Sequence, residues 1–302
     1  MRFIELGQKG NTNATSVFLT LGATLLVFFI SQIIALVAAL AGLGSFDVTG
    51  DMFAIVDAMG SNTFLAIQLL PFLCALLTLM FCLKWIHKRP ILSVFTSRQH
   101  IDWKRFIISA SIWMAIMGLS LLFAVQFSDT VEWHFNSDAF IPLLLISLLL
   151  VPIQTTCEEV LFRGYLLQLF GSSFKSAWLS VLATSILFGL IHAGNPEIDY
   201  LGYIALLYYI LTGVFLAVLA VMDEGLELSM GFHAANNIFG ALILTNDWQA
   251  FQTEALFIDH AQPNFGIEMV LSLVVIQPLL LLLYARIFKW SDWKMKLFRP
   301  LN

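Results

Sequence analysis

Residues 139–170 read AFIPLLLISLLLVPIQTTCEEVLFRGYLLQLF, an apolar run that is interrupted late by two glutamates and an arginine. A helix needs roughly 20 mainly apolar residues to cross about 30 Å of hydrocarbon. The run exceeds that minimum, so it predicts a transmembrane helix that holds Glu158, Glu159 and Arg163 within its length. The same segment therefore indicates both a membrane fold and the first residues of a functional site.

The whole chain has the composition of a membrane protein. Of its 302 residues, 59% are hydrophobic and 12% are charged, whereas a soluble domain is about 45 to 50% apolar and about 25% charged. The mean hydropathy is +0.87, and a water-soluble fold is excluded. The net charge of -5 argues against nucleic acid as a partner. Its cysteines, Cys74, Cys82 and Cys157, have no CxxC spacing, so they predict neither a disulfide framework nor a thiolate zinc site.

Seven further apolar segments lead to an all-α integral membrane protein of about eight transmembrane helices, with residues 1–302 as one polytopic domain. The fifth and seventh segments are the weakest, because they are short and interrupted by polar residues. The first is too long for the core of a signal peptide and is expected to be retained. The spans lie near residues 15–42, 63–86, 104–126, 139–170, 174–193, 201–222, 227–245 and 267–290.

Loop charges predict the orientation, because cytoplasmic loops collect Lys and Arg. With an even number of spans and the N-terminus inside, every Lys and Arg falls on the cytoplasmic side. We therefore expect a multi-pass protein of the plasma (inner) membrane with both termini cytoplasmic. One cytoplasmic loop is acidic instead, with Asp223, Glu224 and Glu227. The opposite loops carry only acidic charges, at Asp47, Asp51, Asp57, Asp129, Glu132, Asp138, Glu197, Asp199, Asp247, Glu254 and Asp259.

Three groups of polar residues lie within predicted spans. An ionisable side chain there costs at least about 2.5 kcal/mol on insertion scales, so a cluster of them is a functional-site hypothesis by default. The remaining polar positions, such as Gln154, are interpreted as packing groups. The three groups are Glu158, Glu159 and Arg163 in the fourth span, His192 in the fifth, and His233 with Asn237 in the seventh.

Helical spacing suggests what each residue does. Glu159 and Arg163 are four residues apart, so they share a face and can form a supporting ion pair. Glu158 points about 100° away and has no local partner, which suits a general base. His233 and Asn237 are also four residues apart and point into one space.

Together these side chains describe the hydrolysis of an amide. A carboxylate and an imidazole facing one water can activate it, and an imidazole and a carboxamide can donate hydrogen bonds to a developing oxyanion. This interpretation requires no cofactor. The alternative is a zinc site of Glu158, His192 and His233, with water in an open position. Asn is a poor zinc ligand and the chain has no HExxH motif, so metal-free hydrolysis fits the residue types better.

Other functions use the same residues. The ion pair, the histidines and the asparagine could instead join helices as buried polar groups. A proton-linked transporter could relay protons through Glu158, Glu159 and His192, although no inverted repeat accompanies them. A non-catalytic membrane protein that binds a partner, or acts in bacteriocin immunity, predicts the same sequence and is the main alternative.

The motifs resemble those of the CPBP family of intramembrane proteases, also called ABI, which includes the type II CAAX prenyl endopeptidases. The resemblance covers residues 150–240, a CPBP-like catalytic core. The family motifs EExxxR, FxxxH and HxxxN match, in order, Glu158, Glu159 and Arg163, then Phe188 and His192, then His233 and Asn237.

This resemblance implies an eight-helix fold with a conical polar cavity and an endopeptidase acting on membrane-associated or CAAX-like substrates. Carried over by position, Glu158 and His192 would activate water, and His233 and Asn237 would stabilise the oxyanion. The family is commonly labelled as metalloproteases, and its site is also read as glutamate-based without metal. The implied partners are membrane lipid and a peptide or protein substrate that arrives from the bilayer.

One depth problem follows from the helix count. With a rise of 1.5 Å per residue, Glu158 lies roughly 20 Å from the hairpin after the fourth span, whereas His233 lies only about 8 or 9 Å into the seventh. For the two to meet, either the fourth helix must extend beyond the bilayer, or a break near Gly225 and Gly231 must carry the seventh helix deeper.

Overall fold

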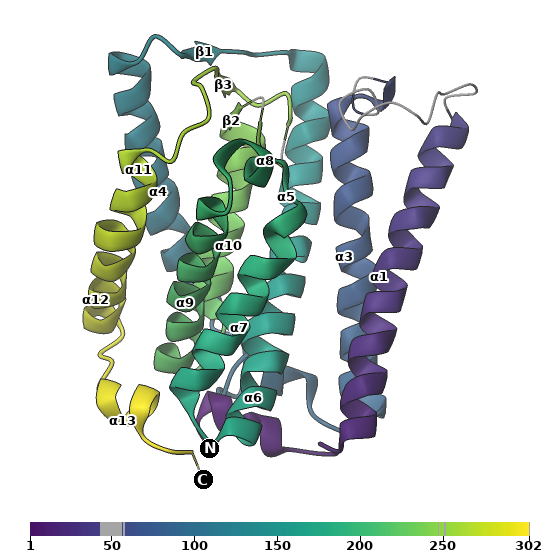
Figure 1. The fold of residues 1–302 in the computed structure, drawn as a ribbon, viewed down its shortest axis with the longest axis vertical. Coiled ribbons are helices and arrows are strands. Elements are labelled where there is room, and N and C mark those ends of the chain that lie inside the picture. The colour runs from purple at the N-terminus through teal and green to yellow at the C-terminus, as the bar shows by residue number, and fades with distance from the viewer. Residues whose placement is uncertain (43–55, 57, 247, 251, 302) are drawn as a thin grey trace.

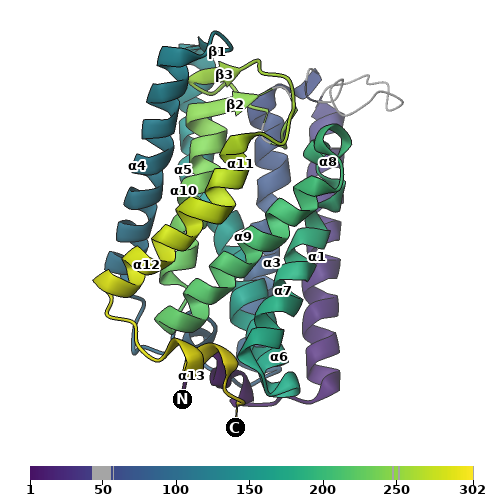
Figure 2. The same ribbon diagram turned by 60° about the vertical axis from the view of Figure 1, so that its left-hand side comes forward.

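The computed structural model describes residues 1–42, 56, 58–246, 248–250 and 252–301. Its long helices lie side by side in a bundle, with some of them tilted (Figures 1 and 2). Within these residues, 7 helices are long and apolar enough to cross a membrane, so the protein is an all-α integral membrane protein that crosses the membrane several times. The acidic loop positions Asp47, Asp51, Asp57 and Asp247 lie outside the described residues.

The candidate spans match seven of the eight predicted segments. The fifth is the shortest, as its polar interruptions suggested. The spans are Ala14–Gly42, Ser61–Trp85, Trp103–Phe127, Ser137–Phe174, Ala177–Gly194, Ile204–Asp223 and Ile267–Ile287.

Figure 1 labels the elements that make up these spans and their connections. The helices are α1 (Ala14–Gly42), α3 (Ser61–Trp85), α4 (Trp103–Phe127), α5 (Ser137–Glu159), α6 (Leu167–Phe174), α7 (Ala177–Ile191), α8 (Pro196–Leu201), α9 (Ile204–Asp223), α10 (Glu227–Ile238), α11 (Ile267–Leu271), α12 (Gln277–Ile287) and α13 (Trp293–Phe298). Short 3-10 turns cover Phe3–Gln8, Ile91–Val94 and His192–Gly194, and π-helical turns cover Val160–Leu166, Phe239–Ile243 and Ser272–Ile276.

The remaining predicted span, 227–245, is a shorter helix inside the bundle. Helix α10 packs against α4, α5 and α9, and its residues from Glu227 to Ala235 are buried. Gly231 allows the close contact with α4, since a Cβ atom there would collide with the carbonyl oxygen of Phe106. The chain leaves helical geometry at Leu244 to form a strand, so α10 is an interior helix of less than membrane-spanning length.

The bundle places apolar side chains outward and small polar ones inward. On α1, Phe18, Phe29 and Ile33 are exposed, whereas Thr20 and Thr24 are buried, and the helix packs against α3. Lipid tails are as apolar as these exposed side chains, so their burial gives no driving force and small residues mediate helix contacts. The exposed apolar surface is therefore the surface that faces lipid.

The helix that carries the two glutamates is longer than a bilayer. Helix α5, the π turn and α6 follow one another without interruption, and the combined span Ser137–Phe174 contains 38 residues, which rise about 57 Å. This length exceeds the hydrocarbon thickness of about 30 Å, and the extension of the fourth helix beyond the bilayer stays a prediction. The helix changes to π geometry immediately after Glu159, and π turns are frequent at functional sites.

Three short strands lie at the end of the bundle opposite the two termini (Figure 1). They are β1 (Val131–Trp133), β2 (Leu244–Asn246) and β3 (Phe257–Asp259). Strand β3 lies in the middle, antiparallel to β1 with Val131 opposite Asp259 and parallel to β2 with Leu244 opposite Phe257. No pattern in the sequence indicated this small sheet, because each strand is only three residues long.

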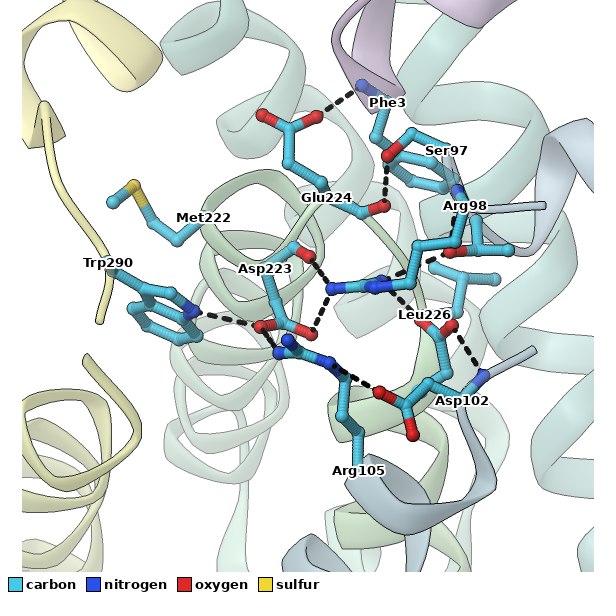
Figure 3. A network of polar contacts seen from close by, with 12 residues as sticks. Phe3, Ser97, Arg98, Asp102, Arg105, Met222, Asp223, Glu224, Leu226 and Trp290 are labelled. Atoms are coloured by element: carbon cyan, nitrogen blue, oxygen red, sulfur yellow. Dashed lines mark hydrogen bonds and ion pairs between the residues drawn. The ribbon is translucent and has the colours of Figure 1, made fainter. Parts of the chain in front are cut away.

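The other end of the bundle is closed by the chain termini. Helix α13 and the N-terminal 3-10 turn lie across this end, near the start of α10 (Figure 2). The turn between α9 and α10 is held there by a network of ions (Figure 3). Asp223 pairs with Arg98 at 3.2 Å, with Arg105, and with the Trp290 indole at 2.8 Å, while Glu227 pairs with Arg98 at 3.1 Å.

Glu224 connects the same turn to both termini. Its carboxylate accepts a hydrogen bond from the backbone N–H of Phe3 at 2.5 Å and pairs with Lys296 of α13 at 2.9 Å. The backbone carbonyl of Glu224 accepts from the Ser97 hydroxyl at 2.9 Å. The acidic turn between α9 and α10, which has no basic neighbours in the sequence, therefore forms ion pairs with Lys and Arg residues from distant segments of the chain.

This closure resolves the depth problem. Asp223 and Glu227 are buried, so α10 starts inside the protein and brings His233 to the level of Glu158. The break is at Gly225, as predicted, but Gly231 lies in the middle of α10 and breaks nothing. Consistently, Ser229 is fully buried and Ser173 is exposed.

We predict that Asp223→Asn destabilises the protein, because the amide cannot serve two arginines as a charge partner. Breaking a buried ion pair costs roughly 3 kcal/mol, which corresponds to a decrease in Tm of about 6 °C or more. Thermal unfolding in detergent measures the change. Asp292→Asn, at an exposed position on the same end, is the matched control, and an equal Tm for both variants would contradict a stabilising role of the network.

Candidate active site

A fully buried ion pair forms the base of the site. Arg163 Nη1 donates to Glu159 Oε1 at 2.9 Å, and both side chains have 0% exposure. The guanidinium carbon of Arg163 also lies 3.9 Å from the centre of the Phe188 ring, a cation–π arrangement. The predicted pairing across one turn is confirmed, and it fixes the helix that carries the neighbouring glutamate.

Glu158 faces helix α10 and not Arg163. Its Oε1 accepts a hydrogen bond from Gln154 Nε2, and its Oε2 lies 3.7 Å from His233 Nε2. Within the described part of the chain, Oε2 accepts no hydrogen bond although it is buried. Glu158 therefore has one oxygen held in place and one free to bind a reacting molecule.

His233 stands between the two glutamates. Its Nδ1 lies 2.9 Å from Glu159 Oε1, and its Nε2 is turned toward Glu158. A carboxylate on one imidazole nitrogen fixes the tautomer and the direction of the other. Helix α10 thus presents Nε2 to the same space as Glu158 Oε2.

His192 enters from the end of α7, where the helix tightens into a 3-10 turn. Its Nδ1 is 2.7 Å from the carbonyl oxygen of Phe188, so Nδ1 carries the hydrogen and donates it, while Nε2 is an acceptor. The Tyr209 ring stacks on it at 4.2 Å between centroids. Phe188 touches both histidines, with centroids 4.6 Å from His192 and 6.0 Å from His233.

Asn237 lies one turn beyond His233 and is joined to the site by Gln154. Asn237 Nδ2 donates to Gln154 Oε1 at 3.1 Å, while Gln154 Nε2 donates to Glu158. Asn236 Nδ2 donates to Asn237 Oδ1 at 3.1 Å. These bonds orient the Asn237 carboxamide and leave its second amide hydrogen available.

A cavity of about 430 Å³ connects these groups. It is lined by Glu158, His192, His233 and Asn237, whereas Glu159 and Arg163 lie behind them. The structure thus brings all four predicted catalytic residues to one cavity and places the predicted supporting pair outside it. The conical shape of the cavity stays a prediction.

The lining residues that were not expected include Gln154, Tyr209 and Glu197. Gln154 lies four residues before Glu158, the helical spacing that indicated the other pairs, so its position was detectable. Tyr209 and Glu197 also line the cavity. Nothing in the sequence indicated that Tyr209, in an apolar helix, would line the site. Glu197 was interpreted only as one of the acidic residues of a loop.

The predicted metal ligands do not gather as a metal site. Among the described residues, no three His, Cys, Asp or Glu side chains are arranged to hold a metal ion. The Glu158, His192 and His233 set therefore does not fit a zinc ion in this arrangement, and the chemistry below is derived from the side chains alone.

Comparison with known families identifies the helical core. Residues 137–239 match the family model described as Type II CAAX prenyl endopeptidase Rce1-like. Residues 137–239 form an Rce1-like domain. The match supports a protease of the CAAX type, and the domain runs from the start of α5 through α10, so it contains every residue of the candidate site.

A curated relative extends the similarity without a function. The "Uncharacterized protein YyaK" of Bacillus subtilis (strain 168) is 35% identical over 164 residues. The aligned part is 54% of this chain and 55% of YyaK, so the chain spans about half the length of this relative. No solved structure matches the chain.

We predict that Arg163→Met in the Rce1-like domain lowers stability strongly, because it leaves the Glu159 carboxylate buried without its cation. Removing one partner of a buried pair costs about 3 to 5 kcal/mol, and replacing both partners costs less. The double variant Glu159→Gln/Arg163→Met, in which the new amide oxygen still accepts from His233, should recover part of the loss in Tm.

The control for this cycle is Arg2→Met, which breaks the more exposed Arg2–Glu5 pair. Such pairs contribute at most about 1 kcal/mol. If Arg163→Met lowered the Tm no more than Arg2→Met, the buried pair would not be the foundation of the site.

Proposed function

We propose that the protein is an intramembrane endopeptidase that hydrolyses peptide bonds of membrane-associated or CAAX-like substrates. The observation that carries this proposal is the free Oε2 of Glu158, buried in the cavity beside His233 Nε2. A carboxylate with one oxygen fixed and the other directed into a cavity is suited to bind and deprotonate a water. The Rce1-like domain supports the same reaction class.

In this mechanism Glu158 is the general base. Its Oε2 takes a proton from a water while the water oxygen forms a bond to the carbonyl carbon of the substrate. The Nε2 of His192 accepts a hydrogen bond from the second hydrogen of the same water, since Nδ1 donates to the carbonyl of Phe188. When the bond between carbon and nitrogen breaks, Glu158 returns its proton to the leaving nitrogen, so the carboxylate is restored.

His233 and Asn237 stabilise the negative oxygen that develops in the tetrahedral intermediate. Asn237 supplies the amide hydrogen that Gln154 does not use, and a protonated His233 donates from Nε2. Glu159 on the other ring nitrogen offsets the positive charge of the imidazolium. Donors of this kind contribute about 3 kcal/mol each to the rate when they are held in place.

The proposed setting is the plasma membrane, with lipid around the bundle and both termini in the cytoplasm. All Lys and Arg residues of the loops lie at the end that holds the termini, which is the cytoplasmic signature. A peptide or protein substrate then reaches the cavity from the bilayer. No cofactor enters the proposed steps.

We predict that Glu158→Gln abolishes cleavage while the protein stays folded, because the amide cannot take a proton from water. Mass spectrometry would compare the N-termini and C-termini of membrane proteins in cells with wild type or variant at equal level. Glu268→Gln, at an exposed acid, is the matched control and should give the wild-type products.

Identical profiles for wild type and Glu158→Gln, with the cellular role retained in the variant, would overturn the proposal. The protein would then be a non-catalytic membrane partner-binding or bacteriocin-immunity-type protein.

We predict that Gln154→Leu lowers kcat roughly tenfold to a hundredfold with little change in KM, since it frees both Glu158 and Asn237 from one shared anchor. Steady-state cleavage of a peptide found in the preceding comparison measures both constants. Gln277→Leu serves as control, because Gln277 is also buried and hydrogen-bonded, to Thr212 at 3.2 Å, but does not line the cavity. A rise in KM alone would instead indicate that Gln154 binds substrate.

A further inference from the structure

The cavity extends well beyond the residues that the proposed reaction uses. From Glu158 it runs past α9 to α8 and to the segment after β2, where Glu197, Asn246 and Trp248 line it. Helix α8 and the segment after β2 lie at the end of the bundle opposite both termini (Figure 1). A substrate in the cavity therefore contacts groups at that end as well as the reacting residues.

Among the Asp, Glu, Lys and Arg side chains, those that line this cavity in the described part of the chain are all acidic. Its charged lining residues are Glu158 and Glu197, and no Lys or Arg lines it within the described part of the chain. The fully buried Arg163 forms its ion pair with Glu159. A bound molecule thus meets two carboxylates in a low-dielectric space. The cationic groups beside them, Arg163 and the protonated His233 of the proposed mechanism, both contact Glu159, so the part of the cavity near Glu197 favours positive charge.

Among the residues that the structure describes, the groups that hold Glu197 in place are neutral. Its Oε1 accepts a hydrogen bond from the backbone N–H of Ala250 at 3.0 Å, and the neutral hydroxyl of Tyr209 lies nearby. Its Oε2 is buried without a hydrogen bond among the described residues. Burial raises the pKa of this carboxyl, as expected for an acid without a cation beside it.

The end of the bundle around this cavity is also rich in acidic residues. All 15 Lys and Arg residues of the chain belong to the opposite end or to the interior. The end that holds α8 carries Asp129, Glu132, Asp138, Asp199, Glu254, Asp259 and Glu268. Summed over one face, such charges attract cationic molecules and repel anionic ones.

We propose that Glu197 forms a specificity subsite for a positively charged group of the substrate, a Lys or Arg side chain or an amine. This inference rests on the proposed endopeptidase function and adds the substrate class. The cation pairs with Glu197 Oε2 while the peptide bond lies at Glu158. A substrate with a carboxylate in the same place is disfavoured, because it would lie beside Glu197 and the described lining holds no Lys or Arg to receive it.

The test uses three peptides of about 20 mainly apolar residues, labelled with a fluorophore and a quencher and differing at one position that is Lys, Gln or Glu. That position is moved along the peptide in a series. At the best position, wild type in detergent should cleave the Lys peptide with a kcat/KM roughly tenfold or more above the Gln peptide, and the Glu peptide should be slowest.

Two variants assign the preference to Glu197. Glu197→Gln keeps an oxygen for the Ala250 hydrogen bond and should remove the advantage of Lys while the rate on the Gln peptide is retained. Glu197→Lys should reverse the order of the Lys and Glu peptides. Glu254→Gln is the matched control, because Glu254 lies at the same end, pairs with His134 at 3.0 Å and does not line the cavity.

Equal rates on the Lys and Gln peptides at every position, or an unchanged preference in Glu197→Gln, would overturn the subsite. Failure of the proposed reaction is distinguishable, because then no peptide is cleaved. In that case fluorescence anisotropy of the labelled peptides still decides the inference. Tighter binding of the Lys peptide to wild type than to Glu197→Gln supports the subsite, and equal binding rejects it.

Discussion

The fully buried Glu159–Arg163 ion pair is the interaction on which the rest of the site depends. Two charges in a low-dielectric interior are tolerated when they pair closely, and here Glu159 Oε2 and Arg163 Nε have no hydrogen bond among the described residues. Phe188 covers the guanidinium, and His233 takes the same carboxylate oxygen from another helix. One ion pair therefore connects α5, α7 and α10, the helices that carry the candidate catalytic groups.

The two ends of the bundle have different roles: one holds the start of α10, and the other contains the opening part of the cavity. At the end that holds the termini, ions from distant segments meet the acidic turn before α10, so the helix can begin inside the protein. At the other end, short strands and α8 leave a cavity open to the reacting groups. Because α10 is too short to cross a membrane, its depth is set by protein contacts and not by lipid.

The sequence predicted the membrane class, most spans and the gathering of Glu158, His192, His233 and Asn237 at one cavity. These predictions succeed because apolar length and helical spacing are local properties. The partners of Asp223 and Glu227 were out of reach, since Arg98 and Arg105 lie more than a hundred residues away. Glu197 was missed for a similar reason. It lies in a loop of the sequence, and only the fold of α8 brings it to the cavity.

The π turn at Val160–Leu166 has a consequence for how the long helix is built. In an α-helix each added residue rotates the following side chains by about 100°, so a regular helix would tie the direction of α6 to that of Glu158. The π turn, Val160–Leu166, changes the phase of α6 relative to that of Glu158 by a fixed amount. The half that bears the glutamates packs against α10. The half beyond it, α6, packs against the N-terminal turn. The long helix thus has two phases, so one continuous helix directs the glutamates toward α10 and directs the apolar face of α6 toward the N-terminal turn.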